Sequence, residues 1–212
     1  AFSRPADWTQ PVAPFRIVGN VYYVGTRGLA AYLITSPAGD ILIDGTLAEN
    51  APLIERNITT LGVRLKDVKV LVNSHAHSDH AGGLAQLKRD TGALMMASQG
   101  DRWSLDHGRH LGDNIYGPGT FPPVPVDRVL KDGDAIRLGG VVLTPHLTPG
   151  HTRGCTTWSL PVRDAGRTLE VVVPCSLTVA GNVLVGNRTY PTIAADYRRS
   201  FARLRAMKAD VG

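Results

Sequence analysis

Cysteine is scarce in this chain, and that scarcity excludes one class of small secreted domain. Only Cys155 and Cys175 occur among 212 residues, so disulfides cannot form the framework of the fold. The sequence alone does not show whether the two pair, and we expect two free buried thiols. Long apolar runs are also missing, since no segment approaches the ~20 apolar residues that a membrane-spanning helix needs. We therefore expect no contact with a membrane.

A strong excess of either charge is missing as well. Lysine and arginine outnumber aspartate and glutamate by 23 to 18, which gives a net charge of +5. The densest basic cluster, Arg198 to Arg205, fits either a solvated helix face or a nucleic-acid contact, and we favour the first. We expect a small-molecule substrate and no nucleic-acid partner, and a mildly basic surface would attract an anionic substrate.

Length and composition suit one ordinary globular domain over residues 1–212. Hydrophobic residues make up 43% of the chain and charged residues 19%, with no repeat or low-complexity tract. The chain starts at Ala1 without a methionine or a signal-peptide pattern, which we interpret as a mature or trimmed protein whose export is hidden. We expect a monomer.

Apolar periodicity predicts two successive β-then-α halves. Helical spacing covers 47–61, 84–88, 101–105 and 194–208, and strand patterns cover 15–18, 21–24, 31–34, 41–43, 68–72, 93–97, 128–130, 135–138, 141–144, 156–160 and 169–173. Residues 107–125 are rich in glycine and proline, and such an irregular segment is functional or mobile. Taken alone, His107 and His110 are surface loop histidines. The order of elements predicts an α/β fold in which two sheets pack together with helices outside.

Four potential metal ligands occur within six positions, directly after the apolar run 68–72: His75, His77, Asp79 and His80. A single histidine is more often an ordinary core or surface residue than a ligand. Four such groups at this spacing, on a loop that we expect at a strand end, indicate a metal site instead. Nitrogen ligands with one carboxylate favour zinc over iron or manganese.

A third imidazole is needed to complete such a site. His151 follows the strand expected at 141–144, and Gly150 would let the backbone turn and aim its ring. His146 is the competing candidate, but Pro145 precedes it within an extended stretch. We favour His151, because three nitrogens and a water form the open tetrahedral site of a hydrolytic zinc enzyme.

Other strand-end residues leave alternatives open. Asp44 is either a turn cap or a hydrogen-bond acceptor behind a ligand imidazole. Cys175 could be a soft ligand and Ser176 a hydrogen-bonding group, although small buried residues are the simpler interpretation.

The ligand cluster, Pro149-Gly-His151 and Asp44 together resemble the metallo-β-lactamase superfamily. The chain is most similar to the third subclass of metallo-β-lactamases, which has serine at the position of Ser176 and histidine at the position of His80. The stretches that carry this similarity are 15–26, 147–158, Tyr190-Pro191 and 196–201, and the resemblance runs from about residue 8 to the end.

The resemblance implies an αβ/βα sandwich of two mixed β-sheets with helices on the outer faces. It also implies two zinc ions, the first held by His75, His77 and His151 and the second by Asp79 and His80. Asp79 would also orient the nucleophile. Ser176 would hydrogen-bond near the second metal, Thr178 would meet the substrate carboxylate, and the segment around Phe121 would flank the substrate cleft.

The chain departs from the family at its end. The family supplies a last histidine to the second zinc from a His-Pro motif and then adds a final strand and helix, whereas this chain stops at Gly212. We consider a truncated chain, an incomplete second site or a ligand from a neighbouring chain. Loss of one protein ligand would weaken the second zinc and reduce turnover.

The resemblance implies hydrolysis of the β-lactam amide of penicillins, cephalosporins and carbapenems by metal-bound hydroxide, and so antibiotic resistance. The family is usually periplasmic or secreted. Two alternatives remain: a thioester or lactone hydrolase of the same superfamily, which shares the ligand cluster, and an inactive metal-binding remnant.

Overall fold

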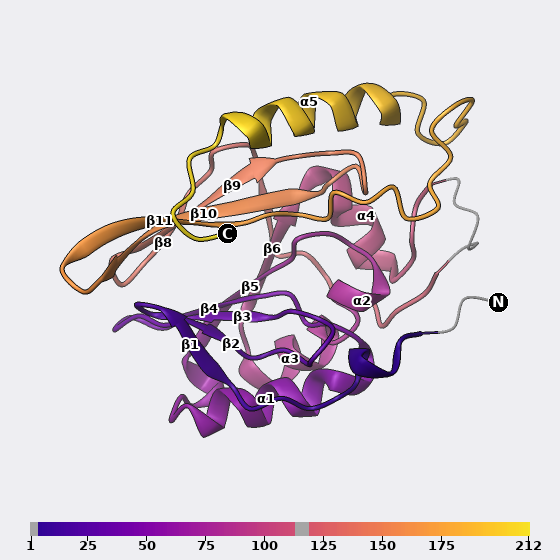
Figure 1. Ribbon diagram of the computed structural model, residues 1–212. Helices are drawn as coiled ribbons and strands as arrows, with labels where there is room; N and C mark the ends of the chain where they lie inside the picture. The colour runs from indigo at the N-terminus through magenta and orange to yellow at the C-terminus, as the bar shows by residue number, and fades with distance from the viewer. Residues whose placement is uncertain (1–3, 113–118) are drawn as a thin grey trace.

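The computed structural model describes residues 4–112 and 119–212. Two β-sheets pack face to face, with helices on both outer sides (Figure 1). The first sheet has the strand order β1-β2-β3-β4-β5-β6-β7, and the second has the order β11-β10-β9-β8. The strands are β1 (Phe15–Val18), β2 (Val21–Tyr23), β3 (Tyr32–Ile34), β4 (Asp40–Ile43), β5 (Val68–Val72), β6 (Leu94–Ser98), β7 (Arg128–Leu130), β8 (Ile136–Leu138), β9 (Val141–Leu147), β10 (Thr156–Asp164) and β11 (Arg167–Val173).

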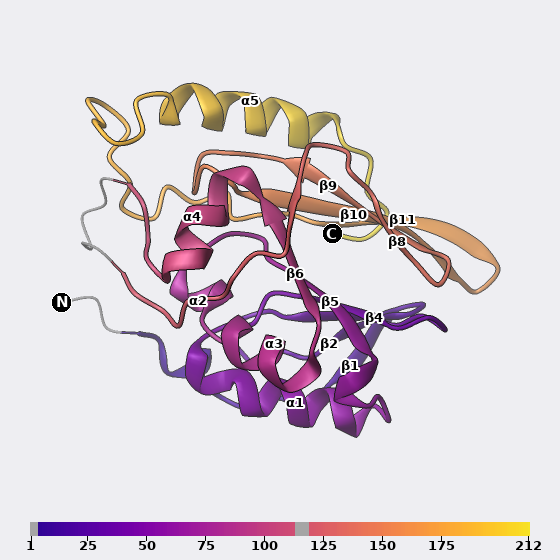
Figure 2. The ribbon, with the colours of Figure 1, turned by 180° about the vertical axis from the view of Figure 1, so that it is seen from behind.

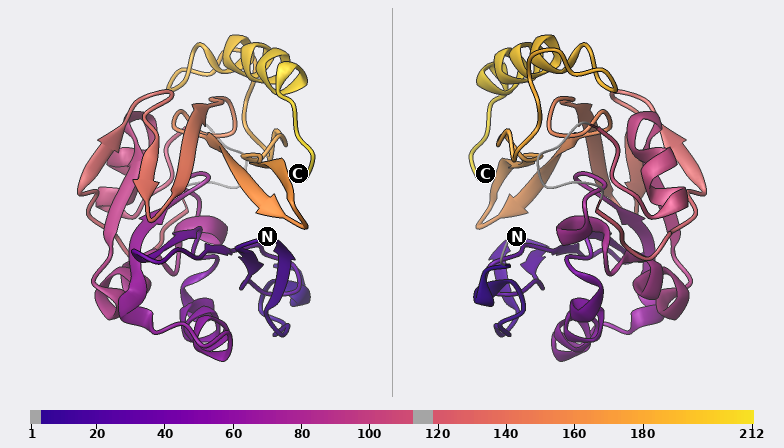
Figure 3. Two further views of the ribbon diagram at one scale, coloured as in Figure 1. Left: turned by 90° about the vertical axis from the view of Figure 1, so that its left-hand side faces the viewer. Right: turned by 90° about the vertical axis from the view of Figure 1, so that its right-hand side faces the viewer.

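The helices are α1 (Ala51–Thr60), α2 (Ser78–Ala81), α3 (Leu84–Thr91), α4 (Gln99–His107) and α5 (Ile193–Ala206). Helices α1 and α3 lie on the outer side of the first sheet, and α5 covers the second sheet (Figures 2 and 3). Short 3-10 turns add Ala6–Trp8, Ala48–Asn50 and Leu65–Asp67.

Side chains on the first sheet alternate between two cores. Leu33, Leu42 and Leu71 pack against the inner faces of α1 and α3. Their neighbours along the strands, including Ile43 and Val72, turn to the other side and meet Trp158 and its neighbours on the second sheet. Because both faces of β4 and β5 are largely buried, these strands are apolar apart from Asp40 and the exposed Lys69 and do not alternate regularly.

The expected αβ/βα sandwich of two sheets with helices outside is confirmed. Strands β4 to β7 pair in parallel and β1 to β4 antiparallel, so the first sheet is mixed. The four described strands of the second sheet are antiparallel throughout, because tight turns join β8 to β9 and β10 to β11. Most element positions agree with the apolar pattern to within a few residues. The pattern missed α2, which is only one turn long.

The parallel strands place their carboxyl ends at one edge of the first sheet. The segment after β5 and helix α2 both lie at this edge (Figure 1). Between α4 and β7, the described residues form no further helix or strand. None of the described helices combines the length and the hydropathy that a membrane crossing requires.

Candidate metal centre

Strand β5 brings two histidines to the carboxyl edge of the first sheet. Every β5 residue except Lys69 is buried, so the strand end is held firmly. His75 follows and is 1% exposed, and His77 takes an extended conformation directly before α2. Because α2 begins immediately after His77, Asp79 and His80 lie on a one-turn helix. Our expectation of a loop was therefore wrong for these two residues.

A second loop, after β9, brings His151 to the same point. Its Nε2 atom lies 3.0 Å from Nδ1 of His77. Its Nδ1–H donates to the carbonyl of Thr178 at 2.8 Å, which leaves Nε2 with a free lone pair. Gly150 has a φ of +148°, and a Cβ there would lie 2.8 Å from the ring of Tyr197. The turn that aims His151 therefore requires glycine.

His146, the competing candidate, lies away from this cluster. It belongs to β9, where its Nε2 and the hydroxyl of Ser159 are 2.9 Å apart. Arg203 on α5 donates to its Nδ1 at 3.1 Å. Both ring nitrogens are thus engaged on the outer side of the second sheet, and only His151 reaches the other histidines.

Three imidazoles converge on one point. One ligand atom each from His75, His77 and His151 lie within 4.8 Å of one another. His75 Nε2 is buried without any hydrogen-bond partner, which is costly unless a cation meets its lone pair. In a tetrahedral zinc site with bonds of about 2.0–2.1 Å, ligand nitrogens lie about 3.3 Å apart. The 3.0 Å between His77 Nδ1 and His151 Nε2 is close to that value. The residues therefore fit zinc.

The protonation of these rings favours metal binding. Burial lowers the pKa of His75 and of His77 well below the usual histidine value, and the charges of neighbouring imidazoles lower both further. Burial also lowers the pKa of His151. The neutral imidazole is the form that coordinates a metal, so the cluster is in its binding form near neutral pH.

A second group of ligand atoms adjoins the first. His75, Asp79 and His80 also place ligand atoms within 4.8 Å of one another. The Nδ1 atom of His80 lies 2.8 Å from Oδ2 of Asp44, and its Nε2 lies 3.7 Å from Oδ2 of Asp79. Burial alone would lower the pKa of His80, but the charge and hydrogen bond of Asp44 and the charge of Asp79 raise it overall. Because Asp44 occupies Nδ1 of His80, the other ring nitrogen, Nε2, is the one that is available to a metal.

Asp44 has an unusual backbone as well as a central side chain. Its φ is +64°, in the left-handed region that disfavours most side chains. This conformation turns the chain directly after β4, so that the next amide, Gly45 N–H, donates to the carbonyl of His80 at 2.7 Å. The carboxylate also accepts hydrogen bonds from the backbone and the hydroxyl of Ser74, at 2.6 and 2.7 Å. Asp44 therefore connects β4, the segment after β5 and α2.

The proposed substrate-side residues fall in two different environments. Ser176 and Thr178 place their hydroxyl oxygens 3.1 Å apart in the segment that accepts the hydrogen bond from His151. Phe121 is instead 7% exposed and packs in the core beside Leu105. Its ring centroid also lies 5.8 Å from that of His110, so a role of this segment beside the substrate stays a prediction.

His110 lies beside the cluster, contrary to our interpretation of it as a surface histidine. Its Nε2 accepts a hydrogen bond from the backbone N–H of Ser78, the first residue of α2, at 2.9 Å. Its ring centroid is 4.4 Å from that of His77, and burial lowers its pKa. His107 does remain on the surface, stacked on Trp103. Nothing in the local sequence distinguishes these two histidines, because only the path of the irregular segment brings one of them to the site.

Cys155 and Cys175 form a disulfide, so the expectation of two free thiols was wrong. Their Cα atoms are 5.8 Å apart. The bond joins the loop that carries His151 to the segment that carries Thr178, and it therefore supports the same contact as the hydrogen bond between those two residues.

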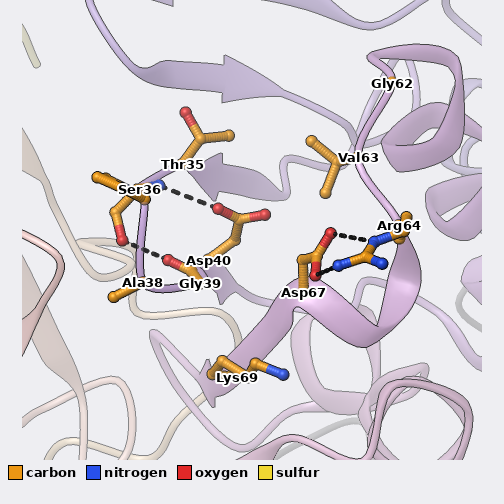
Figure 4. A pocket seen from close by; sticks show the side chains of 11 residues that line it. Thr35, Ser36, Ala38, Gly39, Asp40, Gly62, Val63, Arg64, Asp67 and Lys69 are labelled. Atoms are coloured by element: carbon orange, nitrogen blue, oxygen red, sulfur yellow. Dashed lines mark hydrogen bonds and ion pairs between the residues drawn. The ribbon is translucent and has the colours of Figure 1, made fainter.

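A surface hollow of about 440 Å³ lies at the opposite, amino edge of the first sheet (Figure 4). Asp40, Arg64, Asp67 and Lys69 line it, and Arg64 and Asp67 form an exposed ion pair there. Asp40 starts β4 whereas Asp44 follows it, so the hollow and the histidines lie at opposite ends of one strand. The hollow contains no histidine and is separate from the metal centre.

Comparisons with known proteins agree with this geometry. The sequence profile of the Metallo-beta-lactamase superfamily matches residues 24–211. A hydroxyacylglutathione hydrolase of Hyphomonas neptunium is 33% identical over 93 residues, which are 44% of this chain and 29% of that protein. One from Methylococcus capsulatus is 32% identical over 123 residues, or 58% of this chain and 40% of that protein. The matches thus span well under half of these relatives.

Solved structures match over nearly the whole chain. BJP-1, a subclass B3 metallo-β-lactamase of Bradyrhizobium japonicum, is 45% identical with a TM-score of 0.92, covering 97% of this chain and 78% of that one. The native FEZ-1 metallo-β-lactamase of Legionella gormanii is 44% identical with a TM-score of 0.90, covering 96% of this chain and 79% of that one.

Proposed function

The chain belongs to the metallo-β-lactamase superfamily, and we propose that it is a zinc-dependent hydrolase of the β-lactam amide bond. The observation that carries the proposal is the convergence of one ring nitrogen each from His75, His77 and His151, together with Nε2 of His75, which is buried and unpartnered. The substrate class is supported by 45% identity over 97% of the chain to a subclass B3 metallo-β-lactamase.

In this proposal the three histidines hold a first zinc, and Asp79 and His80 hold a second. Bound zinc would supply Lewis acidity and would lower the pKa of a water molecule to about 7, so that a nucleophile is available at neutral pH. The oxygens of Asp79 are part-exposed beside His80. They can accept a proton from the attacking water at Oδ2 and orient it toward the lactam carbonyl.

The chain also offers groups for the rest of the substrate. The hydroxyls of Ser176 and Thr178 lie on the segment beside His151 and can donate hydrogen bonds to a substrate carboxylate. The net charge of +5 favours the approach of an anionic antibiotic. The disulfide between Cys155 and Cys175 fits an oxidising compartment such as the periplasm, where we propose that the protein acts in antibiotic resistance.

A thioester hydrolase is the second candidate, because the curated relatives include hydroxyacylglutathione hydrolases. Those relatives are 28–33% identical over 44–84% of the chain, whereas the β-lactamase structures are 44–45% identical over 96–97% of it. We therefore favour the β-lactam substrate. A remnant without activity is the third candidate.

The deciding experiment measures turnover of nitrocefin, a carbapenem and S-lactoylglutathione by the zinc-loaded protein. We expect hydrolysis of the two β-lactams, its loss on chelation and its recovery with zinc. His146→Ala should keep this activity, because His146 lies outside the cluster. Thioester turnover without β-lactam turnover would contradict the proposed substrate. No turnover of any of the three, with zinc bound far below one equivalent, would indicate the remnant.

A further inference from the structure

We infer that Asp101 is a positioning residue for the metal centre, because its buried carboxylate joins the two loops that carry the three histidines. Asp101 lies in the first turn of α4 and is 1% exposed. None of its hydrogen bonds involves the side chain of a proposed ligand. Nothing in the sequence indicated a role for it. The inference rests on the metal-binding part of the proposed function and not on the identity of the substrate.

Each carboxylate oxygen faces a different loop. Oδ2 accepts a hydrogen bond from the side chain of Asn73 at 3.2 Å, and Asn73 begins the segment after β5 that carries His75 and His77. Oδ1 accepts from the backbone N–H of Gly154 at 3.1 Å, three residues beyond His151. One side chain thus sets the distance between two segments that are far apart in the sequence.

Close backbone packing strengthens the connection to the second loop. A Cβ on Gly154 would lie 2.3 Å from Ser98 Oγ, and a Cβ on Gly100 would lie 2.4 Å from the carbonyl of Arg153. Ser98 also donates its hydroxyl proton to the carbonyl of Gly154 at 2.7 Å. The loop that carries His151 is therefore seated directly on the first turn of α4, where glycine alone leaves room.

The chemistry of Asp101 argues for a role in placement rather than in bulk stability. Burial raises the pKa of Asp101 to about 6, although the amides of Gly154 and Ala76 and the side chain of Asn73 stabilise its ionised form. A charge in such a position is expensive, and an apolar residue would often stabilise a fold as well. Ala76 lies between His75 and His77, so the carboxylate contacts the first loop on both sides of His75, through the side chain of Asn73 and the amide of Ala76.

Asp40 provides a matched control at the other end of the same sheet. It is also a buried acid, 4% exposed, with a pKa raised by burial. It also accepts a backbone hydrogen bond, from Ser36 N–H at 3.0 Å. Figure 4 shows it at the hollow, whose lining includes no histidine. Its replacement tests the general cost of changing a buried carboxylate.

The test compares Asp101→Asn with Asp40→Asn in the full chain. The readouts are the zinc dissociation constant, measured by competition with a chelator, the visible spectrum after loading with cobalt(II), and the thermal midpoint. Asparagine keeps the shape but replaces one acceptor oxygen with a donor, so the two loops separate or rotate. We expect Asp101→Asn to raise the zinc dissociation constant 10- to 100-fold and to shift the cobalt spectrum. Asp40→Asn should change neither the zinc dissociation constant nor the cobalt spectrum, and its thermal midpoint should be similar to that of Asp101→Asn.

A milder variant keeps the test decisive if Asp101→Asn does not fold. Asn73→Ala leaves the carboxylate in place and removes its side-chain partner on the first loop, and we expect a zinc dissociation constant raised about fivefold. Unchanged zinc affinity and cobalt spectrum in the folded Asp101 or Asn73 variant would overturn the inference. Equal weakening by Asp40→Asn would overturn it too, because the effect would then be general.

The readouts separate this inference from the proposed substrate. If the protein binds zinc, fails to hydrolyse β-lactams and still loses zinc affinity in Asp101→Asn, the inference stands and the substrate proposal fails. If the parent hydrolyses β-lactams and Asp101→Asn binds zinc as tightly as the parent does, the substrate proposal stands and the inference about Asp101 fails. A parent chain that binds no zinc would overturn both.

Discussion

The two ligand groups of this centre share one cluster but are built from different kinds of structure. His75, His77 and His151 come from two loops that leave buried strands, and two of the three are almost completely buried. Asp79 and His80 lie on the single turn of α2, and their side chains are 25% and 23% exposed. A one-turn helix contributes little stability of its own, so its side chains depend on contacts from other segments.

The groups also differ in the carboxylate behind them. Asp101 contacts the backbone around the first group, whereas Asp44 contacts the His80 ring directly. The first group therefore has its geometry fixed by backbone packing before any metal binds, and the second group is oriented mainly by one side-chain hydrogen bond. We infer that the first zinc binds more tightly than the second. The following predictions test that difference, beginning with the largest effect.

Removal of one imidazole from the first group should have the largest effect. In His151→Ala, only two of the three convergent nitrogens remain, so we expect β-lactam turnover to fall by more than about 1,000-fold, beyond the 10- to 100-fold typical of residues that support a ligand. The tight zinc equivalent should also disappear, as metal analysis after dialysis would show. His146→Ala is the matched control. Retention of one tight zinc by His151→Ala would contradict the assignment of the first group.

Loss of the disulfide should have the second-largest effect. It should weaken the first ligand group indirectly, by destabilising the loop that carries His151. Replacement of both Cys155 and Cys175 by serine opens a bridge between positions 20 residues apart. We expect the free energy of unfolding to fall by about 3 kcal/mol, measured in urea. Because this bridge supports the loop of His151, zinc affinity should weaken as well. A loss of stability well below 1 kcal/mol would show that the hydrogen bonds alone hold these segments.

Asp44→Asn should act on the second group selectively. The substitution removes the charge that fixes the His80 ring but keeps a residue type that tolerates the left-handed backbone. We expect the affinity for the second zinc equivalent to fall 10- to 100-fold, with the first changed much less. Stepwise titration with zinc separates the two. Equal weakening of both equivalents would show that the two groups are one unit.

His110→Ala should have the smallest effect. It removes the acceptor for the first amide of α2 and a ring beside His77. Loss of a single hydrogen bond of this kind changes an equilibrium constant about fivefold. We expect a fivefold weakening of the second zinc equivalent and little change in the first. His107→Ala, at the exposed end of α4, is the control. Identical affinities in the two variants would remove His110 from the site.

The parts that the sequence revealed share a physical origin. Apolar patterns report burial, so β4, β5 and the faces of α1 and α3 could be read from their residues. The spacing of His75 to His80 is local chemistry and needs no tertiary information. The turn at Gly150 was also visible, because glycine followed by a ligand type at a strand end is a local signal.

The parts that the sequence concealed depend on contacts between distant segments. Asp101 is an ordinary acid at a helix start until α4 packs against two loops. His110 and His107 differ only through the path of an irregular segment. Pairing of Cys155 with Cys175 could not be deduced from two isolated thiols. Helix α2 was missed because one turn gives no periodicity.

The left-handed backbone at Asp44 has a consequence for how this family of sequences can vary. At φ +64° most side chains are strained, and only glycine, asparagine and aspartate are well tolerated. Of these, aspartate alone supplies a negative charge to His80. The backbone conformation therefore limits this position to three residue types, and the interaction with His80 favours aspartate among them. Any other residue at this position would strain the turn or remove the charge beside His80. The orientation of His80 in the metal centre therefore depends on the geometry of this turn.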